Sequence, residues 1–348
     1  MKVYNCDNCQ NHLYFENGRC LKCRHKVGFD PQKLRFISLI RQADNEYLNH
    51  QNRDEKFKFC KNADHSTCNW ILPISSSHTF CRACALNRTI PNLATEKNVK
   101  RWNLIENAKH RLVYSLLRMN LPVKPKIGNE IEGIAFKFVE TLSPENRIYT
   151  GHSSGTITIN IEEADEKLRI SNKADLGEKY RTLLGHFRHE IGHYYWDVLI
   201  KNTPRVDDFR WNFGNHREDY GKAMEAYYAN GAPENWQKHF ISPYATAHPW
   251  EDWAETWAHY LHMMDTLETA FSFGLGLTGG KRNVNIDSDP YSVASFDRIM
   301  ELWLPLTYAS NSLARSMGHT DFYPFIISTP VKKKLAFIHK LCYSFRNY

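Results

Sequence analysis

The chain has 348 residues, enough for two or three domains, and its 42% apolar and 24% charged residues are typical of a folded protein rather than a disordered one. It contains no uncharged apolar stretch of about 18 residues that would cross a membrane, and no apolar segment typical of a signal peptide follows Met1. We therefore expect a cytoplasmic protein without a membrane partner, whose nine cysteines are thiols or metal ligands rather than disulfides.

Two closely spaced pairs of cysteines lie near the start of the chain, in the pattern C-x2-C-x10-C-x2-C: Cys6, Cys9, Cys20 and Cys23. Each pair can present two thiolates to one metal, and two pairs complete the tetrahedral coordination that Zn²⁺ prefers. The alternative is four reduced thiols without a metal, but so short a segment has too few apolar residues to fold unaided. We therefore predict a zinc ribbon over residues 1–30.

A second cluster of cysteines has the pattern C-x7-C-x12-C-x2-C: Cys60, Cys68, Cys81 and Cys84. Only its last pair is closely spaced, so a nearby histidine, His65 or His78, is an alternative to one of the thiolates. We predict a second zinc ribbon over residues 56–95. The ninth cysteine, Cys342, is expected to be a buried apolar side chain.

A helical linker is predicted on each side of the second ribbon. Residues 31–55 mix apolar and polar positions and are expected to form a linker with a short helix from Pro31 to about His50. Residues 96–126 form the second linker, in which large apolar side chains recur at helical spacing until two prolines end the pattern. We place the boundary of the main domain there.

The N-terminal segment is basic. Residues 1–126 contain 22 Lys and Arg against 10 Asp and Glu, a net charge of +12, whereas the remainder carries −5. If each cysteine site holds one Zn²⁺ with four thiolates, the charge of the segment falls to roughly +8. Such a surface attracts nucleic acid or an acidic partner, but the basic residues are dispersed, so a solvated lysine-rich surface is the alternative.

The rest of the chain, residues 127–348, is predicted to be one α+β domain with few strands. Strands are expected over residues 134–139 and 155–161. The second strand places its three isoleucines on one face and is either an edge strand to which an extended peptide adds, or a buried central strand. Helices are expected over residues 176–198, 218–230, 249–265, 292–318 and 328–345.

A short motif on the first of these helices carries the strongest chemical signal. It reads His189-Glu190-Ile191-Gly192-His193, so two histidines lie four residues apart on one helix face and can bind one Zn²⁺. Glu190, on the same helix, can take a proton from an attacking water and deliver it to a leaving amine. This H-E-x-x-H pattern is typical of zinc metallopeptidases, although two histidines on an ordinary helix are the alternative.

A third zinc ligand must come from another element, because Asp197 lies about 12 Å along the helix from His189. The helix predicted to begin at Pro249 carries two carboxylates one turn apart, Glu251 and Glu255, beside bulky tryptophans. In a chain that already carries H-E-x-x-H, burial at a metal is favoured over a solvated acidic face. We assign Glu251 as the third ligand and Glu255 as the acceptor of the free ring N–H of a ligating histidine.

These residues carry a resemblance to known peptidases. The helix pair resembles the gluzincins, whose third ligand is a glutamate on a second helix, and the segment from Glu251 to Glu255 is similar to the E-x-F-A-E segment of zincins of the toxin lethal-factor type. In that type, a tyrosine seven residues before the ligand stabilises the developing oxyanion, a role that the resemblance implies for Tyr244.

Nearly the whole chain is similar to a bacterial family described as putative zinc-binding metallopeptidases with an N-terminal zinc ribbon. The matching stretches are residues 60–91, 182–194, 244–261, 303–307 and 311–313. The family name implies a zincin-like metallopeptidase fold and a bound zinc ion.

We therefore predict an intracellular endopeptidase with one catalytic and two structural zinc ions, whose ribbons bind a substrate or a partner. The alternative is a nucleic-acid-binding or partner-binding ribbon protein in which the zincin domain is a scaffold or a sensor. The intact Glu190 favours the enzyme, because metal binding alone does not require this residue. A regulatory peptidase that cleaves one partner protein shares the same site and differs only in the breadth of its substrates.

Overall fold

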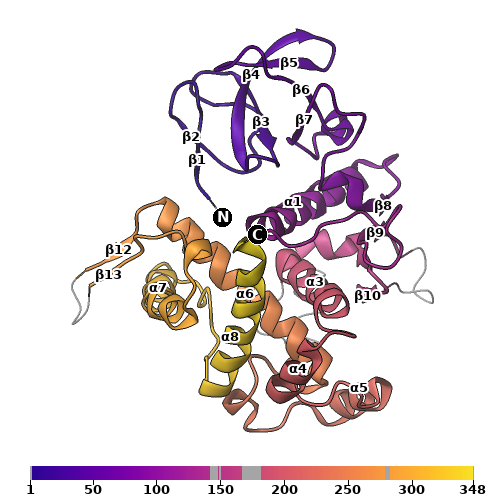
Figure 1. Cartoon of the computed structure of the whole chain (residues 1–348), viewed down its shortest axis with the longest axis vertical. Helices are drawn as coiled ribbons and strands as arrows, with labels where there is room; N and C mark the ends of the chain where they lie inside the picture. Colours follow the sequence, from indigo (N-terminus) through magenta and orange to yellow (C-terminus); the bar gives the residue numbers. More distant parts are fainter. Residues whose placement is uncertain (1, 142–147, 149, 167–181, 279–282, 348) are drawn as a thin grey trace. The chain divides into compact units, whose positions relative to one another are not determined.

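The computed structural model of the chain describes every residue except 1, 142–147, 149, 167–181, 279–282 and 348 (Figure 1). The chain forms two compact units. The N-terminal unit contains Lys2–Arg118 and Pro122–Leu168, and the C-terminal unit contains Met119–Leu121 and Arg169–Tyr348. Together they give an α+β protein in which strands dominate the start of the chain and helices dominate the rest.

Short antiparallel strands build the first part of the N-terminal unit. A hairpin of β1 (Tyr4–Asn5) and β2 (His12–Leu13) precedes a five-stranded sheet in the order β3-β4-β5-β6-β7. The five strands are β3 (Lys26–Asp30), β4 (Arg35–Ala43), β5 (Glu46–Asn49), β6 (Lys56–Phe59) and β7 (Ile71–Pro73). Strand β3 also contacts the segment just before β7, because the main-chain N–H of Phe29 donates to the carbonyl of Asn69 at 2.9 Å.

The helix predicted from Pro31 to about His50 is wrong, because this segment forms β4 and β5. Phe36 and Leu39 of β4 are buried, and the turn between the strands places Asn45 at a φ of 50°, a left-handed conformation that asparagine tolerates. Aromatic and β-branched side chains that pack in a sheet therefore outweigh the mixed spacing that indicated a helix.

The second part of the N-terminal unit combines helix α1 (Glu96–Arg118), which forms as predicted, with a four-stranded sheet. The sheet has the order β10-β11-β9-β8 and contains β8 (Asn87–Thr89), β9 (Ala135–Val139), β10 (Gly151–Ser153) and β11 (Thr156–Asn160). Both strands predicted from the sequence are confirmed. Because β9 pairs with β8, the N-terminal unit extends past the boundary placed near residue 126.

Strand β11 lies inside the sheet, parallel to β9 and antiparallel to β10. Its isoleucines Ile157 and Ile159 and the following Ile161 are fully buried. The alternative of an edge strand for peptide addition is therefore wrong, because both sides of the β11 main chain are already paired.

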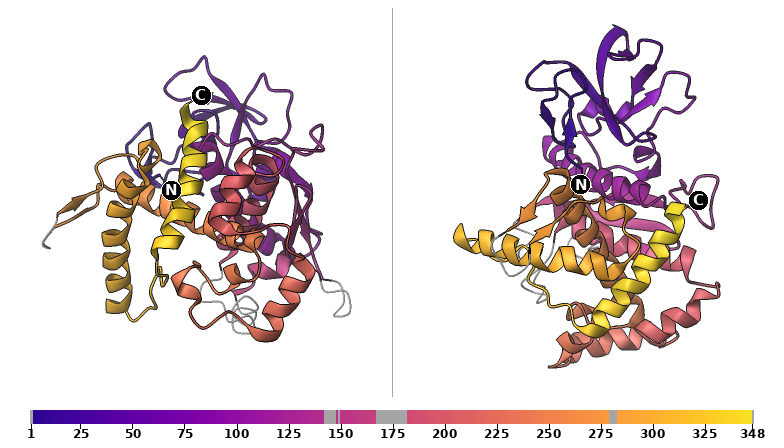
Figure 2. Two further views of the ribbon diagram at one scale, coloured as in Figure 1. Left: turned by 60° about the horizontal axis from the view of Figure 1, so that its bottom comes forward. Right: turned by 60° about the vertical axis from the view of Figure 1, so that its left-hand side comes forward.

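The C-terminal unit is helical among its described residues, apart from a small hairpin of β12 (Gly276–Leu277) and β13 (Val284–Asn285). Its helices are α3 (Leu183–Leu199), α4 (Arg205–Phe213), α5 (Tyr220–Asn230), α6 (Pro249–Ser272), α7 (Phe296–Ser316) and α8 (Thr329–Ser344). The helices predicted in this region are confirmed, although residues 176–181 of the first prediction lie outside the described residues. Helix α6 packs against α3, α4, α7 and α8 (Figure 2).

Helices α3 and α6 approach each other closely at Gly192. A Cβ atom at this position would lie 3.0 Å from Cα of Ala254 and 3.1 Å from Cβ of Trp257, so only glycine fits without displacing the partner helix. The indole N–H of Trp253 donates to the carbonyl of Gly192 at 2.8 Å. The H-E-x-x-H segment is thus fixed against the first half of α6.

Helix α8 is joined to α6 by a buried ion pair. Nζ of Lys334 lies 2.5 Å from Oδ2 of Asp252 and also donates to the carbonyl of His239 at 2.8 Å. The thiol of Cys342 is fully buried on α8, as predicted. Among the described residues, no helix combines the length and the apolar character needed to cross a membrane.

Candidate metal centres

The two histidines of the H-E-x-x-H motif point to one place. Thr182 caps α3 by accepting a hydrogen bond from the main-chain N–H of Gly185 at 2.9 Å, and the helix then presents His189 and His193 one turn apart. Their Nε2 atoms are 3.1 Å from each other. Each ring therefore offers the same nitrogen to a shared ligand.

Glu251 approaches these nitrogens from the first turn of α6. His248 caps this helix by accepting from the main-chain N–H of Trp250 at 3.0 Å, and Pro249 occupies the first helical position. Oε2 of Glu251 lies 3.0 Å from Nε2 of His189 and 3.4 Å from Nε2 of His193. The three residues assigned as zinc ligands from the sequence are thus brought together by α3 and α6.

The separations between these three atoms fit a zinc ion. Tetrahedral ligands at about 2.0–2.1 Å from the metal lie about 3.3–3.4 Å from one another, close to the 3.0–3.4 Å that separate the two nitrogens and Oε2 of Glu251. This oxygen is buried and accepts no hydrogen bond from any described residue. Three electron-pair donors that converge in a buried place favour a cation between them.

The pKa values of His189 and Glu251 also indicate that this place favours a positive charge. Burial lowers the pKa of His189, but the carboxylates of Glu251 and Glu255 more than reverse this effect and raise it well above its ordinary value. Burial raises the pKa of Glu251, yet the two imidazoles hold it well below its usual range. The site therefore stabilises its carboxylates as anions.

Glu255 contacts the second ring nitrogen of His189. Nδ1 of His189 donates to Oε1 of Glu255 at 2.7 Å, and the hydroxyl of Ser242 donates to the other carboxylate oxygen at 2.6 Å. Burial raises the pKa of Glu255, but the hydrogen bond and charge of His189, the charge of His259 and the hydrogen bond from Ser242 together outweigh it and lower this pKa to about 2. This contact leaves Nε2 of His189 to face the metal position.

Glu190 and two tyrosines lie around the same position. Glu190 is 8% exposed, and the ring of Tyr244 lies 5.9 Å from the ring of His189 between centroids. Tyr220 of α5 donates its hydroxyl hydrogen to Oε1 of Glu251 at 2.8 Å. Burial and the charge of Glu251 raise the pKa values of both tyrosines, so their hydroxyls stay protonated and can donate hydrogen bonds.

The sequence did not reveal two of these residues, Tyr220 and Ser242. Tyr220 lies 31 residues before Glu251 on a different helix, and Ser242 lies 13 residues before Glu255 in a loop. Neither belongs to a motif with a fixed spacing. Their roles depend on how the chain between α4 and α6 folds back over the site.

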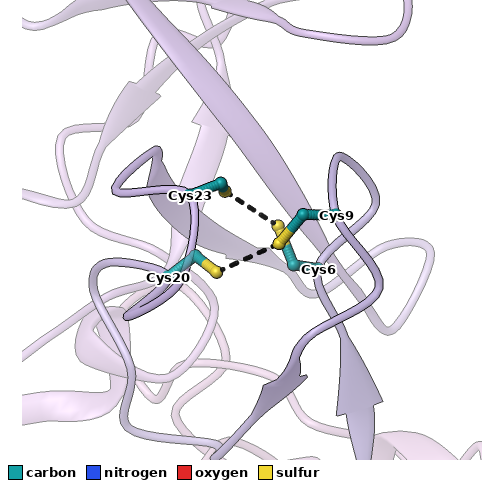
Figure 3. A group of neighbouring side chains, drawn as sticks. All are labelled: Cys6, Cys9, Cys20 and Cys23. Atoms are coloured by element: carbon teal, nitrogen blue, oxygen red, sulfur yellow. Dashed lines mark hydrogen bonds between the residues drawn. The ribbon is translucent and has the colours of Figure 1, made fainter.

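The first four cysteines gather at one point of the N-terminal unit, as the ribbon requires (Figure 3). Sγ of Cys6 lies 3.6 Å from Sγ of Cys23, and Sγ of Cys9 lies 3.5 Å from Sγ of Cys20. Thiolates at about 2.3 Å from a tetrahedral zinc ion are about 3.7–3.8 Å apart. Figure 3 shows the two pairs facing each other from two loops, which is the arrangement of a zinc ribbon.

The second four cysteines also gather, with 3.8 Å between the sulfurs of Cys68 and Cys81. Hydrogen bonds from the other three thiols lower the pKa of Cys60, whereas burial raises the pKa of Cys68. The four thiols therefore cannot all ionise in this buried place without a cation. The alternatives weighed from the sequence, His65 and His78, do not join the group.

The comparisons with known proteins agree with this geometry. Residues 98–341 match the model of a family described as "Putative zinc-binding metallo-peptidase", and residues 3–95 match a model described as "zinc-ribbon domain". No solved structure matches the chain.

Relatives of the chain occur in mycobacteria. The chain is 36% identical over 340 residues to "Uncharacterized protein Rv2568c" of Mycobacterium tuberculosis and to "Uncharacterized protein Mb2598c" of Mycobacterium bovis. The similarity covers 97% of this chain and 94% of each relative. The chain belongs to the family described as "Putative zinc-binding metallo-peptidase", and its N-terminal segment is a zinc-ribbon domain.

Proposed function

We propose that the chain is a cytoplasmic zinc-dependent endopeptidase. The observation that carries this proposal is the triangle of His189, His193 and Glu251, because three protein donors leave a fourth zinc position open, as in catalytic rather than structural sites. Zinc bound there would polarise the scissile carbonyl and make a water molecule a better nucleophile at neutral pH.

The residues around the triangle have separate roles in this proposal. Glu190 takes a proton from the attacking water and delivers it to the leaving amine. Tyr244 donates a hydrogen bond to the carbonyl oxygen as negative charge develops on it. Glu255 keeps the His189 ring in the orientation that directs Nε2 toward the metal.

The complete chain would bind three zinc ions: one at the triangle and one at each cysteine cluster. The ribbons would then act as a module that recognises the substrate or a partner protein. A regulatory peptidase that cleaves a single partner is one form of this proposal, and it differs only in the number of proteins that the site accepts.

A nucleic-acid-binding protein is the second candidate, favoured by the net charge of +12 over residues 1–126. In this alternative, the ribbons carry the function and the helical unit is a scaffold or a sensor. DNA affinity would fall steeply with salt concentration, and no peptide would be cleaved.

Replacing Glu190 by glutamine tests the proposal. Glu190→Gln should keep three equivalents of zinc and lose peptide hydrolysis, because the amide cannot accept the proton of the attacking water. Asp197→Asn is the matched control, since the same change on the same helix affects a half-buried carboxylate that pairs with Lys201. The inactive variant should also retain substrate proteins from a cell lysate. Equal cleavage by Glu190→Gln and the wild type would refute the assignment.

A further inference from the structure

Helix α1 brings a histidine to the second cysteine cluster. Nε2 of His110 lies 3.3 Å from Sγ of Cys68 and 3.6 Å from Sγ of Cys84, and the side chain is 4% exposed. The three residues belong to the same compact unit. His110 lies 42 and 26 residues after the two cysteines, so the fold rather than a local motif creates this contact.

Two contacts fix the orientation of the His110 ring. Its Nδ1 donates to the main-chain carbonyl of Glu106 at 2.7 Å, and its ring packs against the ring of Trp70 with 5.1 Å between centroids. Because a carbonyl oxygen and a thiolate can only accept, the ring holds both partners when Nδ1 and Nε2 each carry a hydrogen, with Nε2–H directed at the sulfurs. The imidazole is thus held in place for an interaction with the cysteine cluster.

The neighbouring carboxylate of Glu106 is already used by other groups. Oε2 of Glu106 lies 2.8 Å from Nζ of Lys109, and Oε1 accepts from the side-chain amide of Asn87 at 2.6 Å. Glu106, His110 and Cys84 lie close enough to hold a metal ion, but a buried carboxylate paired with an ammonium group is poorly placed for a second cation. His110 lies nearer to the sulfurs than Glu106, whose Oε2 is 3.9 Å from Sγ of Cys84.

We infer that His110 is a functional part of the second zinc site and holds Cys68 and Cys84 in place. The role is that of a positioning residue, because the four thiolates already complete the coordination of zinc. The site is then composite. Its cysteines lie in the segment matched by the zinc-ribbon model, whereas His110 lies in the segment matched by the metallopeptidase model.

Thermodynamic linkage makes this contact reciprocal. Whatever His110 adds to zinc affinity, bound zinc adds equally to the docking of α1 on the ribbon. Loss of the metal from the second site would therefore loosen the helix that begins the metallopeptidase segment. This inference concerns the ribbon alone and does not depend on the proposed hydrolysis.

The test measures how strongly zinc protects each group of cysteines in the full-length protein. Wild type and His110→Ala are incubated with increasing EDTA and then with iodoacetamide, and mass spectrometry quantifies alkylation of each cysteine-containing peptide. The first cysteine cluster is an internal reference in the same molecule. His65→Ala is the matched control, because the His65 ring packs near Trp102, 5.7 Å away between centroids, and is not part of the cysteine group.

In His110→Ala, the cysteines of the second cluster should lose protection at a chelator concentration about 10–100-fold lower, the usual loss when a residue that supports a metal ligand is removed. The first cluster and the His65→Ala variant should behave as wild type. His110→Gln, which keeps a side-chain N–H, should recover part of the protection. Unchanged protection of the second cluster in His110→Ala, or an equal loss in both clusters of both His110 variants, would overturn the inference.

Discussion

The second cysteine cluster and the His–Glu triangle are both buried groups of metal-binding side chains, but they differ in how many donors they provide. The cluster offers four sulfurs with His110 beside them, whereas the triangle offers two nitrogens and one oxygen. Four protein donors close a zinc site, and three leave a position for water or substrate. The donor count therefore separates a site that maintains the fold from a site that can perform chemistry.

The secondary structure around the cysteine cluster also differs from that around the triangle. The sulfurs come from turns, loops and strand ends, beside a small apolar core on strands β4 to β7 that includes Ile37, Leu39 and Ile71. The triangle lies between two long helices whose close contact at Gly192 does not involve the metal ligands. We therefore expect removal of zinc to release the cysteine-bearing loops of the ribbon and to leave the helix pair folded.

The largest effect should follow from Cys60→Ser. The apparent free energy of zinc binding in small zinc-finger peptides is about 10–16 kcal/mol, and much of it is folding free energy. This variant should lose one equivalent of zinc, and residues near the second cluster should become sensitive to limited proteolysis. Cys342→Ala, which removes a buried thiol from α8, should keep all three zinc ions. If Cys60→Ser kept its zinc and its folded ribbon, the second cysteine cluster would depend on its metal no more than the triangle does.

The next effect concerns the third ligand of the triangle. Glu251→Ala should abolish zinc binding at this site and activity with it, while the ribbon zinc ions and the helical circular dichroism signal remain. Glu255→Ala should weaken zinc binding by only about 10–100-fold, because it removes the support of His189 rather than a ligand. Metal titration of both variants checks the order, and a reversed order would exchange the roles of the two glutamates.

The smallest effect should distinguish the two tyrosines that lie beside the triangle. Tyr244→Phe should lower kcat by about 10²–10³ and leave KM and zinc content nearly unchanged, as expected for a donor to the developing oxyanion. Tyr220→Phe should instead weaken zinc binding, because its hydroxyl hydrogen-bonds to Glu251. Kinetics at saturating zinc separate the two variants. Wild-type kcat in Tyr244→Phe would reduce this residue to a packing role.

The sequence was most informative where ligands lie on one helix or within one short loop. The spacing of His189 and His193 follows from helix geometry, and the pairing of the first four cysteines follows from two tight C-x2-C turns. Alternation also identified β11, but it could not show that this strand pairs on both sides. That information is in the partner strands rather than in the strand itself.

The sequence was least informative where contacts join distant segments. His110, Tyr220 and Ser242 reach their sites only through tertiary structure, and no local pattern marks them. The helix predicted from Pro31 to about His50 was wrong for a related reason. Its side chains suit a sheet whose other strands lie elsewhere in the chain, so local spacing alone favoured a helix.

The ion pair between Asp252 and Lys334 has a consequence for the order in which the protein is made. The two residues are 82 positions apart, and at about 5–20 residues per second Lys334 leaves the ribosome roughly 4–16 s after Asp252. Until then, the helix that carries Glu251 would have to bury an uncompensated carboxylate. The cysteine clusters can therefore bind metal on the nascent chain, whereas the His–Glu triangle is completed only after Lys334 has been synthesised.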